Sequence, residues 1–281
     1  RQWLLELLSE LWKKRGAYPG LFSVLSYLNF SEGMEYYKKK TETGESKHAY
    51  SELKDLITGK TKEIKELQLN DKSVKELQRN WKLKNNNEQK LLIDILPRFD
   101  ISKIHIENIL SEKRERNNVY SSLKQIIQNP YNICEEYIGD DIDDYVTFSK
   151  IDHGVIPSPE VGIEEIFSKN DPERFRALCV DQLKFSDVHT FVSYNTILER
   201  INSRLSYLPE WKKEVFTKKY FEVDEEVIGE KITLKDQGDT KYLYLKNIYE
   251  DERKIQLILE ELVNRPDIEI KKPVTESTFT E

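Results

Sequence analysis

One stretch of this chain alternates apolar and polar residues, and it limits the folds open to the whole C-terminal third. Residues 230–247, "EKITLKDQGDTKYLYLKN", hold two alternating runs separated by "DQGD". Alternation with a period of two indicates strands, and a short link that contains glycine favours a hairpin. The segments on both sides carry apolar residues every three or four positions, which indicates amphipathic helices. A single hairpin within a helical region is therefore predicted.

Three helices are predicted before this hairpin. The first begins at "DPE", residues 171–173, which supplies a capping aspartate, a proline at the first helical position and an acid in the first turn. The second runs from about Ser193 to Leu205, with aliphatic residues at intervals of four. The third begins with the proline of "LPEWKKEVFTKKYF", and the residues it should bury are Trp211, Val215 and Phe216.

A closing helix is predicted after the hairpin, in "IYEDERKIQLILEELVNR". One apolar stripe should face the core, and it consists of Ile248, Ile255, Ile258 and Leu262. Pro266 should end this helix because proline cannot continue one. Three helices, a hairpin and a closing helix follow the order of a winged helix. We therefore expect a winged-helix-like domain with one β-hairpin over residues 171–264.

The rest of the chain is expected to be mainly α as well. Ten glycines and nine prolines in 281 residues argue against long disordered linkers and against a β-rich sandwich. Residues 1–118 should form a helical N-terminal module. Residues 119–170 contain "NPYNICEEYIGDDIDDY" and "IDHGVIPSPEVG", whose prolines and glycines indicate an irregular connector. Residues 265–281 should be a linker.

The tripeptide Gly59-Lys60-Thr61 matches the end of a phosphate-binding loop of the type G-x-x-x-x-G-K-[ST]. The first glycine of that motif is missing, because Lys54 occupies its position. The residues before it, "YSELKDL", indicate a charged amphipathic helix, whereas the motif requires a buried strand. We therefore predict that Gly59 ends a helix, and we expect no ATP site here.

Composition indicates a protein of the cytoplasm. No run of 18 apolar residues occurs, so no membrane span is expected, and the N-terminus lacks the features of a secretory signal. The two cysteines, Cys134 and Cys179, provide neither a disulfide framework nor a zinc site. Because the chain begins at Arg1 without an initiator methionine, we expect it to be a piece of a longer protein.

Charge is distributed unevenly along the chain. Residues 1–118 carry 23 Lys and Arg against 18 Asp and Glu, whereas residues 119–281 carry 21 against 33, which gives −7 in total. A phosphate-binding surface would therefore have to be a local patch, and solvated helix faces are the alternative. The candidate nucleic-acid-binding residues, on the third helix and the hairpin, are Lys212, Lys213, Lys218, Lys219, Lys231, Lys235 and Lys241.

Three stretches carry a resemblance to a known family. "NDPERFRALCVDQL" resembles the helix that opens the pre-motor module of RecD-like superfamily 1 DNA helicases, the exodeoxyribonuclease V alpha type. "KYLYLKNIYEDERKIQLILEEL" resembles the strand and helix that the family places before its motor. "NPYNICEEYIG" resembles a helix of the family's helix-hairpin-helix region, although the acidic "GDDIDDY" that follows departs from the DNA-contacting hairpin. The resemblance covers roughly residues 91–264.

The resemblance implies a non-catalytic, DNA-facing N-terminal region of an ATP-dependent DNA helicase. Its motor, with ATP and Mg²⁺, would lie outside this chain, because no phosphate-binding loop follows Arg265. The implied partners are DNA, held weakly as single strands or junctions, and the protein's own C-terminal ATPase motor. We assign no catalytic residue, no metal ligand and no cofactor to the chain itself.

Two alternatives remain open. A protein-interaction module could dock a nuclease or another partner through exposed aromatic residues of "GMEYYKKK", residues 33–40. A metal-dependent nuclease is the less favoured alternative: "PDIEIKK" supplies Asp267, Glu269 and Lys271, a set that resembles an Mg²⁺-binding site but comes from one short stretch. The acidic residues Asp140, Asp141, Asp143 and Asp144 complete no known ligand pattern.

Overall fold

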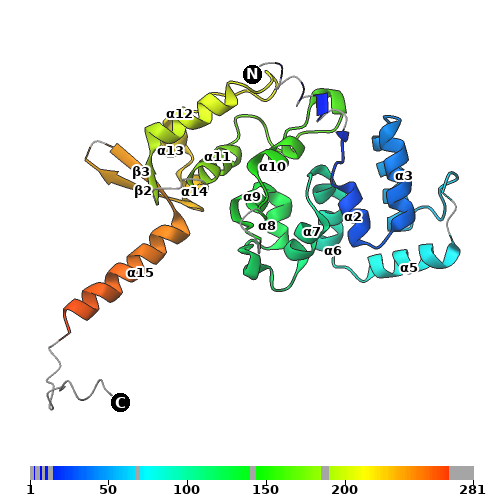
Figure 1. Ribbon diagram of the computed structural model, residues 1–281, viewed down its shortest axis with the longest axis horizontal. Helices are drawn as coiled ribbons and strands as arrows, with labels where there is room; N and C mark the ends of the chain where they lie inside the picture. Colours follow the sequence, from blue (N-terminus) through cyan, green and yellow to red (C-terminus); the bar gives the residue numbers. More distant parts are fainter. Residues whose placement is uncertain are drawn as a thin grey trace, which may run out of the picture.

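The protein is mainly helical and carries one small antiparallel sheet (Figure 1), as expected for the fold class. The computed structural model describes residues 15–67, 70–139, 144–184, 190–238 and 240–265, together with residues 3, 7, 10 and 11. The N-terminal helices lie at one end of the molecule and the sheet at the other. Between them lie short helices from the middle of the chain.

The N-terminal module is built from helices and short helical turns. They are α2 (Leu21–Tyr27), α3 (Ser31–Glu42), α4 (Ser46–Thr58), α5 (Asp71–Lys82), α6 (Asn86–Lys90), the π-helical segment η1 (Leu91–Ile95), the 3-10 turns η2 (Leu96–Arg98) and η3 (Arg114–Asn117), and α7 (Lys103–Leu110). Gly59 ends α4 in the left-handed conformation, with φ of 82°. The prediction that Gly59 terminates a helix is confirmed.

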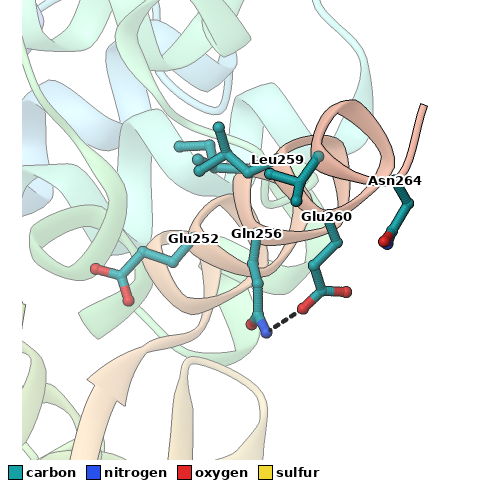
Figure 2. Close-up of a pocket in the computed structure, with 7 residues that line it drawn as sticks. Glu252, Gln256, Leu259, Glu260 and Asn264 are labelled. Carbon is teal, nitrogen blue, oxygen red and sulfur yellow. Dashed lines mark hydrogen bonds between the residues drawn. The ribbon is translucent and has the colours of Figure 1, made fainter. Parts of the chain in front are cut away.

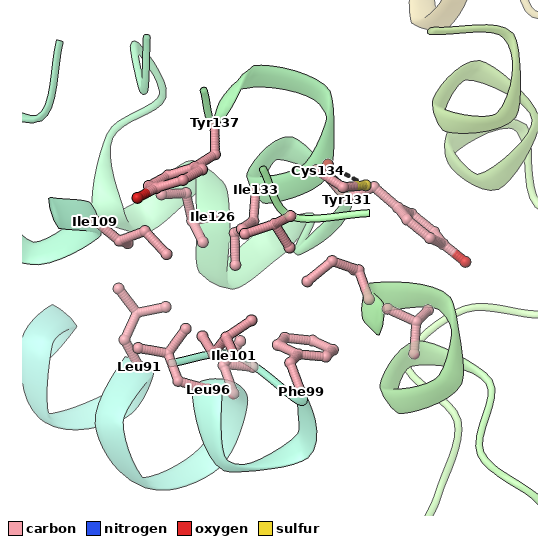
Figure 3. Packing of buried hydrophobic residues seen from close by; sticks show 14 of the residues in the cluster. Leu91, Leu96, Phe99, Ile101, Ile109, Ile126, Tyr131, Ile133, Cys134 and Tyr137 are labelled. Carbon is pink, nitrogen blue, oxygen red and sulfur yellow. Dashed lines mark hydrogen bonds between the residues drawn. The ribbon is translucent and has the colours of Figure 1, made fainter. Parts of the chain in front are cut away.

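The expected connector contains regular structure. Its elements are α8 (Leu123–Gln128), α9 (Tyr131–Glu136), α10 (Phe148–Val155) and the 3-10 turn η4 (Pro159–Val161). Buried residues of α8 and α9, such as Ile126 and Ile133, pack in one cluster with Leu91, Leu96 and Ile109 of the N-terminal module (Figure 3). Residues on both sides of position 118 therefore share a hydrophobic core.

The C-terminal third contains helices and a three-stranded sheet. Its elements are α11 (Pro172–Lys184), β1 (Phe191–Ser193), α12 (Tyr194–Leu205), α13 (Lys219–Val223), α14 (Glu225–Gly229), β2 (Ile232–Gln237), β3 (Thr240–Leu245) and α15 (Lys246–Val263). The strand order is β1-β3-β2, and both pairs are antiparallel. The hairpin and the helix from Ser193 to Leu205 are confirmed, with Ser193 capping α12.

The predicted helix from Pro209 to Phe221 is wrong over most of its length. Residues 209–217 make one turn and then run without regular structure until α13. The side chain of Asn202 makes hydrogen bonds with both backbone polar groups of Phe216: its Nδ2 donates to the carbonyl at 2.8 Å, and its Oδ1 accepts from the amide at 2.9 Å. Phe216 is buried as expected, Trp211 is partly buried, and Val215 is 66% exposed.

The expected burial of the closing helix is also wrong. No residue of α15 is buried, and Ile255 and Ile258 are 58% and 57% exposed. Figure 1 shows α15 extending from the sheet away from the other helices. The predicted helix is present, but no surface in the described part of the chain covers its apolar stripe. Pro266 lies outside the described residues.

Candidate nucleic-acid interface

Lys212, the first of the seven candidate lysines, is buried and does not belong to a surface. Its side chain is 1% exposed, and its Nζ lies 2.8 Å from Oδ2 of Asp152 on α10. Asp152 also accepts from Nε of Arg174 at 2.9 Å and from the hydroxyl of Tyr131 at 2.7 Å. Two cations therefore share one carboxylate in the interior. This arrangement removes Lys212 from the candidate nucleic-acid surface.

The electrostatics of this buried group follow from desolvation and charge. Burial alone would raise the pKa of Asp152, but Lys212 and Arg174 hold that pKa well below its usual range. Burial lowers the pKa of Lys212 to about 8, although Asp152 opposes the shift. Burial, together with the charge of Lys212, also lowers the pKa of the neighbouring His153 to about 4. The cluster is a buried ion pair, because the side chains of Asp152, Arg174 and Lys212 are all at most 3% exposed.

A second buried arginine on α11 makes a similar group. Nε and Nη2 of Arg176 donate to the two carboxylate oxygens of Glu135 on α9, both at 3.0 Å. Arg176 also pairs with Glu173 at 2.9 Å and with Glu230. Burial raises the pKa of Glu173 to about 7, and Glu135 and Glu230 add to the shift while Arg176 opposes it. Three carboxylates thus surround one guanidinium.

Lys231 belongs to a third ion-paired group, which is centred on Glu136 of α9. It pairs with Oε1 of Glu136, whose side chain is only 5% exposed. Oε2 of the same carboxylate accepts from the amides of Tyr120 and Ser121, both at 2.8 Å. Lys231 therefore fixes the start of β2 to the middle of the chain, which leaves it little freedom to meet phosphate.

These buried pairs connect the middle of the chain to the C-terminal third. Asp152, Glu135 and Glu136 come from α9 and α10, and their partners come from α11, β2 and the turn after α12. The expected boundary at residue 171 therefore runs through buried ion pairs. We expect residues 119–264 to unfold together, because separating the two sides would leave arginines buried without partners.

Two of the remaining lysines have acidic neighbours at the surface. Nζ of Lys213 lies 2.7 Å from a carboxylate oxygen of Glu210, and Nζ of Lys241 lies 3.9 Å from one of Asp236. Such exposed pairs contribute little to stability, and solvent and salt weaken them further. They reduce the local positive charge, so neither lysine offers a full charge to a ligand.

Lys218, Lys219 and Lys235 are exposed and have no carboxylate partner among the described residues. Nζ of Lys218 lies 4.6 Å from the ring centroid of Tyr194, and Nζ of Lys235 lies 4.7 Å from that of Tyr249. A lysine over an aromatic face keeps its charge and is held in place by the ring. We therefore restrict the candidate surface to these three lysines, which we call the free-lysine group.

The surroundings of the free-lysine group are acidic. Glu222, Glu225, Glu226 and Glu230 follow Lys219 on α13 and α14, and all four are exposed. These carboxylates would repel a phosphate backbone laid along the two helices. The acidic side chains therefore disfavour a duplex laid along these helices.

The other candidate sites gain nothing from the structure. Tyr36 and Tyr37 of "GMEYYKKK" are each 4% exposed, with their hydroxyls bonded to Glu52 and to the carbonyl of Tyr18, so the expected exposed aromatics are wrong. Asp144 contacts Nε2 of His105 at 2.7 Å. The acidic residues 140–143 and the nuclease-like residues 267–271 lie outside the described residues.

Cysteine and metal chemistry have no centre in the described part of the chain. Cys134 and Cys179 are free and buried, and burial raises the pKa of both thiols far above their usual range. Among the described residues, no three His, Cys, Asp or Glu side chains are grouped so that they could hold a metal ion. Nor does any described helix have the length and apolar character needed to cross a membrane.

Comparison with known proteins was made at three levels. No family model, no curated protein and no solved structure matches this chain.

Proposed function

We propose that this chain is a non-catalytic, DNA-facing accessory region of an ATP-dependent DNA helicase, whose motor lies outside it. The free-lysine group carries the proposal: three exposed lysines without carboxylate partners among the described residues lie at the start of α13 and on β2. The order of elements also supports it. A helix, a short strand, further helices and a hairpin, with sheet order β1-β3-β2, are compatible with the winged-helix-like domain expected from the sequence.

The proposed contact is weak and independent of base sequence. Lysines contact phosphates as point charges and do not select bases. The acidic α13 and α14 disfavour a duplex laid along these helices, so the proposed substrate is a single strand or a junction. With three phosphates neutralised, non-specific affinity on the order of 10⁻⁴ to 10⁻⁶ M is expected.

Fluorescence anisotropy with a labelled single strand tests the proposal. A variant with Lys218→Gln, Lys219→Gln and Lys235→Gln should bind more weakly than wild type. The matched control changes three exposed lysines of the N-terminal module, Lys38, Lys39 and Lys72, to Gln, so both variants lose the same charge. Equal weakening in both variants would show that only net charge matters and would reject the free-lysine group as a site.

A second candidate function is protein docking, and the exposed face of α15 favours it. A shallow hollow of about 410 Å³ runs along this helix, and the residues that line it all belong to α15 or its C-terminal end (Figure 2). Ile255, Ile258 and Leu259 are each more than half exposed. A row of exposed aliphatic side chains on one helix marks a protein-binding face. The helicase motor is the proposed occupant.

Changing Ile258→Glu and Leu262→Glu tests this second candidate. Both side chains are exposed, so the melting temperature should change little. In the parent protein, the double variant should release the motor from this region, which limited proteolysis would detect as faster cleavage between the two. Unchanged cleavage would reject α15 as the docking face.

A further inference from the structure

The register of the small sheet sorts its side chains onto two faces. Directly paired residues of neighbouring strands lie on the same face. Val192 pairs with Leu243, which in turn pairs with Leu234, and this face packs against the hydrophobic core. The opposite face, which we call the outer sheet face, carries Phe191, Ser193, Thr233, Lys235, Gln237, Thr240, Tyr242 and Tyr244.

Aromatic rings on the outer sheet face contact one another. The centroid of Phe191 lies 5.4 Å from that of Tyr242 and 5.1 Å from that of Tyr244. Tyr249, in the first turns of α15, extends the row, with its centroid 5.4 Å from that of Tyr244. All three contacts are edge-to-face or tilted, so none of these pairs is stacked face to face. Rings from three elements thus form a partly exposed row.

Lys235 lies at the β2 side of this row, with Nζ 4.7 Å from the Tyr249 centroid. It belongs to the free-lysine group, so its charge is available beside the rings. A carboxylate is also near: burial raises the pKa of the Tyr244 hydroxyl, and Glu252 adds to the shift while Lys235 opposes it. Because the charge of Lys235 is available, a phosphate would meet Lys235. A base would meet the rings of Phe191 and Tyr242.

The composition of the outer sheet face separates it from the face of α15. Its strand residues are aromatic, hydroxyl, amide and lysine side chains, and none of those described is aliphatic. The exposed face of α15 carries isoleucine, leucine and valine instead. Every base has a π-face that can stack on an aromatic ring, and single-strand-binding proteins combine such rings with nearby positive charge. Aliphatic side chains, in contrast, suit a protein partner.

We propose that the outer sheet face binds single-stranded nucleic acid by stacking its bases on Tyr242 and Phe191, with Lys235 holding the adjacent phosphate. The proposal rests on the proposed DNA-facing function and assigns the bases to a site that the lysines alone do not supply. Its consequence is a preference for unpaired strands, because paired bases in a duplex do not expose their faces to the rings.

The test compares two strands of equal length, an oligothymidylate and an abasic strand with the same number of phosphates. Wild type should bind the abasic strand roughly 5- to 100-fold more weakly, which is the range for one stacked base. Tyr242→Leu should weaken oligothymidylate binding by a similar factor and should reduce the difference between the two strands, because only Phe191 is then left to stack a base. Tyr242→Phe keeps the ring and should keep both.

Tyr207→Leu is the matched control, because Tyr207 is 48% exposed and follows α12, outside the strands of the sheet. It should bind as wild type does. Quenching of a 2-aminopurine base in the strand reports stacking independently of affinity, and it should occur with wild type and be reduced with Tyr242→Leu. Circular dichroism establishes that the variants are folded.

The outcomes separate the two proposals. Equal binding of both strands by wild type overturns stacking but leaves phosphate binding by the free-lysine group in place. If Tyr242→Leu binds oligothymidylate as wild type does, with the quenching retained, the outer sheet face is not the base site and suits a protein partner instead. Binding of neither strand at low salt overturns the DNA-facing function together with this inference.

Discussion

Lys212 and Lys218 are six residues apart, belong to the same basic stretch and have opposite environments. Lys212 is 1% exposed and contacts Asp152, which comes from an element sixty residues earlier in the chain. Lys218 is exposed and lies over the ring of Tyr194. The difference shows that a cluster of lysines in a sequence can combine a structural ion pair with a candidate binding surface. Only the fold distinguishes the two.

Among the changes that test this comparison, removing the buried carboxylate of Asp152 should have the largest effect on stability. Asp152→Ala leaves Lys212 and Arg174 in the interior without their shared partner, and such a change costs about 3–5 kcal/mol of unfolding free energy. Urea denaturation followed by circular dichroism measures it. The control is Asp236→Ala, whose side chain is 77% exposed at the hairpin. A similar, small change in both variants would contradict the structural role of the Asp152 group.

Glu173→Gln tests the second buried group through its pH dependence. The folded-state pKa of Glu173, about 7, is above its usual value of 4.5, so the folded protein holds a proton that the unfolded chain has lost between these pH values. The stability of wild type should therefore fall as pH rises from about 4.5 to about 7.

The glutamine variant should lack this part of the pH dependence. It should be more stable than wild type at pH 8, by about 1–2 kcal/mol, since the 23% exposure of the Glu173 side chain screens part of the effect. Thermal melts of both proteins at pH 4.5, 6 and 8 give the result. Parallel pH profiles would show that Glu173 does not carry a raised pKa.

Lys212→Met should change stability less than Asp152→Ala does. Methionine fills a similar volume, Arg174 still neutralises Asp152, and replacing a buried charge by a hydrophobic side chain is often neutral or stabilising. We expect a change within about 1 kcal/mol and unaltered DNA affinity. Loss of DNA binding in a folded Lys212→Met protein would mean that Lys212 contacts DNA. The contrast between a structural Lys212 and an exposed Lys218 would then be wrong.

The elements that local signals specify were predictable from the sequence. Gly59 ends α4 in the left-handed conformation that favours glycine, and Ser193 caps α12 with its side chain. The alternating runs around Gly238 predicted the hairpin, because strand alternation and turn residues are signals that span only a few neighbouring positions. The first strand, β1, has only three residues, which is too short for a period to be recognised.

The features that depend on distant contacts were not predictable. Asn202 holds Phe216 outside a helix, and nothing between Pro209 and Phe216 indicates this. The burial of Lys212 depends on Asp152, whose own neighbourhood shows no sign of a lysine partner. The stripe on α15 has the right period, but a period reveals one apolar face without revealing what covers it. The alternation in "TKYLYLK" predicted the strand that holds Tyr242 and Tyr244, but neither was a candidate site residue, and Phe191 joins them only through the pairing of β1.

The free-lysine group should have the smallest effect on stability. Changing Lys218, Lys219 and Lys235 to Gln alters only exposed side chains, so each change should stay within about 0.5 kcal/mol. A thermal melt of the triple variant beside wild type measures this. A drop of several degrees would place these lysines with Lys212 as structural residues.

The most direct test of the central claim is the salt dependence of single-strand binding, measured by anisotropy for wild type and for the triple variant. Each neutralised phosphate adds about 0.7 to the magnitude of the log–log slope on single strands. Three lysines therefore predict a slope of about −2 for wild type and a slope near zero for the triple variant. Equal slopes for the two proteins would contradict the account, because they would show that the three lysines contact no phosphate.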